Sequence, residues 1–90
     1  MSEPGPARPS LPIGVRLRFD EVRQKHFLLY PEGALGLNET AVAVLELCDG
    51  VRTVDEIAAV LGERYGADVR EDVRSLLEAI AARELVEHVG

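Results

Sequence analysis

Residues 26–48 read HFLLYPEGALGLNETAVAVLELC, and the spacing of their apolar side chains changes at Asn38. Before Asn38, two short apolar runs flank Pro31-Glu32-Gly33, a sequence typical of a tight turn between antiparallel strands. After Asn38, a favourable N-cap residue, the apolar positions recur with the 3.6-residue period of a helix. The stretch therefore predicts a β-hairpin, with strands over 26–30 and 34–37, followed directly by a helix.

The chain on the amino-terminal side of this hairpin predicts one more strand. Val15, Leu17 and Phe19 alternate with polar residues, which is the period of a half-buried strand, here with a basic outer face. Residues 1–12 hold four of the five prolines, so they are expected to form a mobile arm. The folded domain is then predicted to span residues 13–90.

Two further helices are predicted on the carboxyl-terminal side. Thr53-Val54-Asp55-Glu56 has the pattern of a capping box, and Gly66 ends the apolar stripe that follows it. Asp68 is expected to cap the third helix, and Leu85-Val86 to pack on the core or add an edge strand. The apolar stripe of the third helix consists of Val69, Val73, Leu76, Leu77 and Ile80. Three short strands followed by three helices predict an α+β fold of the winged-helix (winged helix-turn-helix-like) type, with a three-stranded antiparallel sheet.

Length, charge and composition exclude several classes of protein. Ninety residues make one domain at most, and a formal net charge of −6 argues against binding to nucleic-acid phosphates. One cysteine excludes an internal disulfide and suits a reducing compartment. No apolar run approaches the roughly 20 residues that cross a bilayer, and no signal peptide is recognisable. We therefore expect a cytoplasmic protein that binds neither nucleic acid nor a membrane.

No group of side chains predicts catalysis or a metal site. His26 and His88 lie far apart in the sequence, and neither has a cysteine or carboxylate at a metal-ligand spacing. Cys48 lies on the apolar face of the first predicted helix, where a thiol is usually buried and inert. We expect no enzyme activity, no catalytic residue, no metal and no cofactor.

The strand over 34–37 is the feature that predicts a function. At the edge of a three-stranded meander, its unpaired N–H and C=O groups can bind a peptide by strand addition. The long third helix, which has more apolar positions than one contact requires, would supply side-chain pockets beside it. One alternative is a winged-helix transcription factor that binds DNA. Another is a self-associating unit, in which the free edge or the Pro-rich arm pairs with a second copy to form a homodimer.

Five blocks of the sequence are specific enough to compare with known families. They are Val22-Arg23-Gln24, Leu28-Leu29-Tyr30-Pro31-Glu32-Gly33, Leu37-Asn38, Leu45-Glu46-Leu47-Cys48-Asp49-Gly50 and Thr53-Val54-Asp55-Glu56-Ile57. With these blocks the chain resembles, from about Arg16 to Val86, the PqqD family (pyrroloquinoline quinone biosynthesis protein D). It departs from that family at Glu84-Leu85, where members often carry glycine followed by tryptophan.

The resemblance implies a winged-helix peptide-recognition module, of the kind used to make ribosomally synthesised and modified peptides. It implies that the chain binds the precursor peptide PqqA and presents it to PqqE, a radical S-adenosylmethionine enzyme. In related modules the peptide adds beside the third strand and packs on the third helix. Carried over to this chain, the peptide-binding residues are Ala34, Leu35, Gly36, Leu37, Val69, Val73, Leu76, Leu77 and Ile80. Some of the five helical residues must face the core, and the sequence does not distinguish them.

Overall fold

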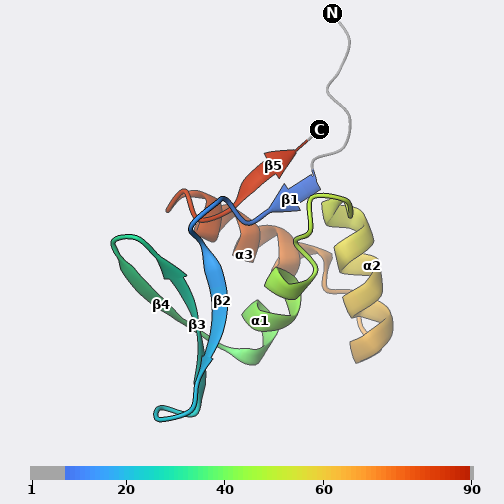
Figure 1. The fold of residues 1–90 in the computed structure, drawn as a ribbon. Coiled ribbons are helices and arrows are strands. Elements are labelled where there is room, and N and C mark those ends of the chain that lie inside the picture. Colours follow the sequence, from blue (N-terminus) through green and yellow to red (C-terminus); the bar gives the residue numbers. More distant parts are fainter. Residues whose placement is uncertain (1–7, 90) are drawn as a thin grey trace, which may run out of the picture.

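The computed structural model describes residues 8–89 as five strands and three helices. In chain order they are β1 (Arg8–Ser10), β2 (Arg16–Asp20), β3 (Lys25–Tyr30), β4 (Gly33–Leu37), α1 (Glu39–Glu46), α2 (Val54–Tyr65), α3 (Arg70–Ala81) and β5 (Glu87–Val89). Strands β2, β3 and β4 form a three-stranded antiparallel sheet, and the helices lie together on one side of it (Figure 1). This is the α+β winged-helix architecture that the sequence predicts.

The register of the sheet divides its side chains between two faces. Arg16 lies opposite Leu29 across β2 and β3, and Tyr30 lies opposite Gly33 across β3 and β4. Because successive residues of a strand point to opposite sides, the inner face, toward the helices, carries Leu17, Phe19, His26, Leu28, Tyr30, Leu35 and Leu37. The outer face carries Arg16, Arg18, Asp20, Lys25, Phe27, Leu29 and Ala34, together with Gly36.

The helix starts of α1 and α2 follow the sequence prediction, whereas that of α3 differs. Asn38 Oδ1 accepts a hydrogen bond from the Ala41 N–H at 2.8 Å, and Thr53 with Glu56 forms the predicted capping box of α2. Asp68 lies one residue before the N-cap position, and its carboxylate accepts from the N–H and the guanidinium of Arg70, the first residue of the helix. The N-cap of α3 is therefore Val69, which has no side-chain cap.

The core lies between the inner face of the sheet and the helices, and it is aliphatic. Leu28 of β3, Val44 of α1 and Ile57 of α2 are completely buried. Leu85 and Val86 are buried as well, so this segment packs back on the core as predicted, immediately before β5. None of the helices in residues 8–89 combines the length and hydrophobicity that a membrane span requires.

A two-stranded sheet, β1 with β5, differs from the predicted arm over residues 1–12. Residues 1–7 lie outside the described residues, but Arg8–Ser10 pair with Glu87–Val89 in antiparallel register (Figure 1). Pro9 fits this strand because its carbonyl accepts from the Gly50 N–H at 2.9 Å, on the side away from β5. At that position β5 requires no N–H from the proline. The described fold thus includes a strand, β1, within the segment predicted to be an arm.

Candidate functional site

Strand β4 is an edge of the three-stranded sheet. The strand order is β2-β3-β4, so within residues 8–89 β4 pairs with β3 alone. A two-residue turn joins Tyr30 to Gly33, and in such hairpins the pair that flanks the turn exchanges hydrogen bonds, after which the pattern alternates. The N–H and C=O groups of Ala34 and Gly36 therefore point away from β3, toward the free edge.

The side chains of β4 leave this edge accessible. Ala34 and Gly36 on the outer face are exposed, whereas Leu35 is half-buried and Leu37 is buried on the inner face. No residue of β4 is charged. Uncharged, small side chains beside outward-facing amides allow a second backbone to approach and complete the sheet.

The structure separates the five apolar positions of the third helix. Val73, Leu77 and Ile80 are 1%, 3% and 3% exposed, so their side chains belong to the core. Leu76 is half-buried and packs at the margin of that core, as Leu35 of β4 does. Leu76 is therefore the residue of this stripe, within α3 itself, that retains exposed apolar surface.

Val69, the fifth of these positions, lies in a different environment. It lines a hollow of about 210 Å³ between the helices, together with Thr40, Leu61, Tyr65, Asp72 and Val73. Its neighbours in this hollow come from α1, α2 and α3, and none comes from β4. This hollow therefore does not join Val69 to the edge strand.

The groups with catalytic potential are not assembled into a reactive site. Burial raises the pKa of the Cys48 thiol to about 12, and its Sγ lies 3.3 Å from the Val44 carbonyl, so the thiol stays protonated at neutral pH. The ring of His26 packs against that of Phe19, with centroids 4.8 Å apart. Within the described part of the chain, no cluster of three or more His, Cys, Asp or Glu residues could hold a metal ion.

The exposed arginines of α3 face carboxylates. Arg70 contacts Asp68 at 3.0 Å, and Arg74 contacts Glu71 at 3.4 Å. The hydrogen bonds from Arg70 lower the pKa of Asp68, which stays ionised beside it. A recognition helix of a DNA-binding protein presents its cations to phosphates. The pairing of these two arginines with acids favours the peptide hypothesis over the DNA alternative.

Two outer-face residues near β4 were absent from the predicted site. A Cβ placed on Gly36 would lie 2.9 Å from Lys25 Nζ and 3.6 Å from Phe27 Cε2, so both side chains reach the edge strand. The turn at Pro31-Glu32 already implies that Phe27 lies opposite Gly36, and this could have been deduced from the sequence. The direction taken by the long Lys25 side chain could not.

Comparison with known proteins identifies one family. The model of that family, described as coenzyme PQQ synthesis protein D (PqqD), matches residues 25–86. The chain is 50% identical over 82 residues to the bifunctional coenzyme PQQ synthesis protein C/D of Methylorubrum extorquens. That alignment covers 88% of this chain but only 22% of the relative, so the chain spans about a fifth of the bifunctional protein.

Two further matches cover most of this chain and most of the protein to which it is aligned. The PqqA binding protein of Methylococcus capsulatus is 44% identical over 66 residues, which are 72% of this chain and 71% of the relative. The solution NMR structure of the PqqD truncation of Methylobacterium extorquens PqqCD superposes with a TM-score of 0.76 at 50% identity. The superposition covers 88% of this chain and 87% of the solved chain. The solved protein represents a functional, stand-alone RiPP recognition element.

Proposed function

This chain belongs to the PqqD family of coenzyme PQQ synthesis proteins, as its sequence predicts, and we propose that it binds the precursor peptide PqqA without catalysing a reaction. Relatives of similar length are named PqqA binding proteins, and a solved relative is a RiPP recognition element. Both names support the proposal.

The peptide binds by adding a strand to β4. The observation that carries this proposal is the free edge, where β4 pairs only with β3 within residues 8–89 and the amides of Ala34 and Gly36 point outward. Backbone hydrogen bonds to these amides supply affinity, and alternate side chains of the peptide enter pockets on the two faces. Leu35 of β4 and Leu76 of α3 are both half-buried at the margin of the core, and the peptide is proposed to cover the apolar surface that each leaves exposed.

The remaining predicted residues have supporting positions. Val73, Leu77 and Ile80 hold α3 against the core and do not contact the peptide. Leu37 has the same role at the end of β4, where it is 6% exposed. The proposed contact set therefore reduces to the outward backbone of β4 with the side chains of Leu35 and Leu76.

The bound peptide is presented to PqqE, the radical S-adenosylmethionine enzyme named by the family resemblance, and the chemistry takes place there. Two properties of this chain support a non-catalytic role. Its single cysteine is buried with a pKa of about 12, and its half-buried histidine, His26, packs on an aromatic ring.

Calorimetry with synthetic PqqA tests strand addition at β4. A recognition module of only 90 residues is expected to bind the peptide with a Kd of about 1 μM, equivalent to about −8 kcal/mol. Ala34→Pro removes an outward N–H without removing a bond to β3, and it leaves a peptide carbonyl unpaired, so affinity should fall about tenfold or more. Ala34→Ser is the matched control, because it keeps the N–H at similar size and should bind normally.

The same titrations distinguish the competing possibilities. A folded Ala34→Pro variant, with wild-type circular dichroism and thermal stability, that retains full affinity for PqqA would exclude β4 as the binding edge. Self-association through β4 predicts a dimer in light scattering that Ala34→Pro weakens and that added PqqA dissociates. A dimer that persists at saturating PqqA uses another surface.

A further inference from the structure

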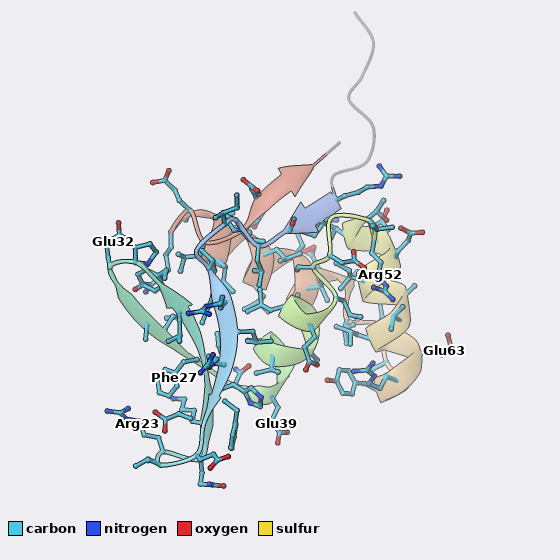
Figure 2. The ribbon with its side chains drawn as sticks, viewed as in Figure 1. Arg23, Phe27, Glu32, Glu39, Arg52 and Glu63 are labelled. Carbon is cyan, nitrogen blue, oxygen red and sulfur yellow. The ribbon has the colours of Figure 1, made fainter. Side chains whose placement is uncertain are left out.

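The outer face of the sheet is left uncovered by the helices and is rich in cations. The helices lie beyond the inner face, whereas Arg23 and Phe27 are labelled on the opposite, left-hand side of the sheet in Figure 2. Four basic residues gather here, Arg16 and Arg18 from β2, Arg23 from the β2–β3 turn and Lys25 from β3. This concentration contrasts with the net charge of −6 of the whole chain.

These cations are only partly neutralised. Arg23 contacts Asp20 at 3.0 Å, and backbone hydrogen bonds from Arg23 and Val22 lower the pKa of that carboxyl, so the pair stays ionised. For the other three, Arg16, Arg18 and Lys25, no carboxylate within residues 8–89 lies within ion-pair distance. The outer face therefore carries an excess of positive charge that an acidic ligand can neutralise.

Lys25 brings part of this charge to the free edge. Its Nζ would lie 2.9 Å from a Cβ at Gly36, so the ammonium crosses from β3 to β4 over the glycine. It lies 5.9 Å from the ring centroid of Phe27, and the Arg23 guanidinium lies 5.8 Å from the same ring. The Phe27 ring, flanked by two cations, thus lies on the outer face next to Gly36 of β4.

A hollow connects Arg23 and Phe27 to Ala34 of the edge strand. Its volume is about 270 Å³, and it is lined by Arg18, Phe19, Asp20, Arg23, Phe27, Leu29 and Ala34. Ala34 and Gly36 are the only outer-face residues of β4, and both are small. A side chain from a strand beside β4 can therefore pass over them and reach the cations.

We propose that this outer face is a second side-chain site, which selects an acidic residue of the peptide bound at β4. The proposal rests on strand addition, which directs every second peptide side chain onto the outer face. Directly paired residues have Cβ atoms about 5 Å apart, so a glutamate opposite Gly36 reaches the Lys25 ammonium. The ligand is then a two-faced strand, apolar toward α3 and acidic toward Lys25.

A double-mutant cycle tests this pairing. Each Asp and Glu of synthetic PqqA is replaced in turn by Asn or Gln, and each peptide is titrated into wild type and Lys25→Gln. An exposed ion pair is worth a few-fold in affinity, so Lys25→Gln should weaken binding about threefold. Replacement of one particular acidic residue of the peptide should weaken binding to wild type about threefold and should leave binding to Lys25→Gln unchanged. Lys25→Glu should weaken binding about tenfold, and a lysine at that peptide position should restore it.

Arg64→Gln is the matched control, because it removes one exposed positive charge from α2, on a different element from the outer face. Equal losses in Lys25→Gln and Arg64→Gln would overturn the proposal, since net charge alone would explain them. The proposal would also be overturned if no acidic position of the peptide were coupled to Lys25. If Ala34→Pro still lost affinity in that case, the separate hypothesis that PqqA binds by strand addition to β4 would stand. If wild type failed to bind PqqA, the proposed function itself would be wrong.

One further result would overturn the pairing in favour of a different partner. Lys25→Gln could leave PqqA affinity unchanged yet weaken the binding of PqqE to the PqqA-loaded protein. That outcome would assign the outer face to an acidic surface of a second protein. The same titration series, repeated with PqqE present, distinguishes the two.

Discussion

The two edges of the three-stranded sheet have equal length but opposite character. β2 has the sequence RLRFD, with Arg16, Arg18 and Asp20 charged, whereas β4 has the sequence GALGL and no charge. Natural edge strands are commonly protected from further pairing by charged side chains. An unpaired edge is therefore not in itself a binding site, and the side chains beside it decide whether a second strand can approach.

The outer face links the two edges. The charges that protect β2 extend across Phe27 toward β4, where Lys25 ends over Gly36. Cations of the outer face thus border both edges, Arg16 and Arg18 on β2 and Lys25, from β3, beside β4. Three substitutions test the sheet and its neighbouring helix, and a fourth, Asp49→Asn, changes a residue outside the sheet.

Leu28→Ala should have the largest effect, because β3 supports both edges. Leu28 is completely buried on the inner face, and its truncation should lower the free energy of unfolding by about 3 kcal/mol. Leu29→Ala, one position along on the outer face, removes a half-buried side chain and should cost clearly less. Urea unfolding compares the two variants, and equal losses would contradict the assignment of inner and outer faces.

Leu76→Asp should weaken PqqA binding about tenfold, because a charge would replace apolar surface proposed to face the peptide. Ser75→Asp places the same charge at the adjacent, exposed position of α3 and should bind normally. Calorimetry on both variants, after circular dichroism has verified their folding, measures the difference. Equal affinities would remove α3 from the proposed site and leave β4 alone.

Asp49→Asn should change how the stability of the fold depends on pH and should leave PqqA binding unaltered. Asp49 forms an isolated β-bridge with Ser10 of β1 and lies outside the sheet that contains β4. Hydrogen bonds from the backbone of Arg52 and Val51 lower the pKa of Asp49 in the folded protein. The ionised carboxylate therefore stabilises the fold above the ordinary aspartate pKa of about 4, and this contribution is lost as pH falls through the lowered value.

Unfolding of Asp49→Asn and wild type at pH 7 and pH 3 measures that contribution. The variant should be slightly less stable at pH 7, and the difference from wild type should shrink at pH 3. A difference that stayed constant between the two pH values would show that the carboxylate charge is not its source.

Leu17→Pro should have little effect on binding. By the same alternation, the Leu17 N–H on β2 points away from β3, so this variant is the counterpart of Ala34→Pro at the charged edge. PqqA affinity should stay within about twofold of wild type, since the peptide is not expected to pair with β2. A loss comparable to that of Ala34→Pro would mean that the two edges are equivalent, and the contrast between them would be invalid.

Much of the fold and part of the site could be predicted from neighbouring residues. Asn38, the capping box at Thr53 and the turn at Pro31-Glu32 act through groups a few positions apart, so local spacing is enough to identify them. The edge position of residues 34–37 followed from the same hairpin. The family resemblance rested on these blocks and is confirmed.

The tertiary structure alone decided the rest, because burial and long-range pairing depend on what packs against a segment. It placed Val73, Leu77 and Ile80 in the core and left Leu76 partly exposed, although all four lie on one apolar stripe. It paired Arg8–Ser10 with Glu87–Val89, whose separation in sequence leaves no local signal. Likewise, a long flexible side chain such as Lys25 takes its direction from the empty space over Gly36, which exists only once β3 and β4 are paired.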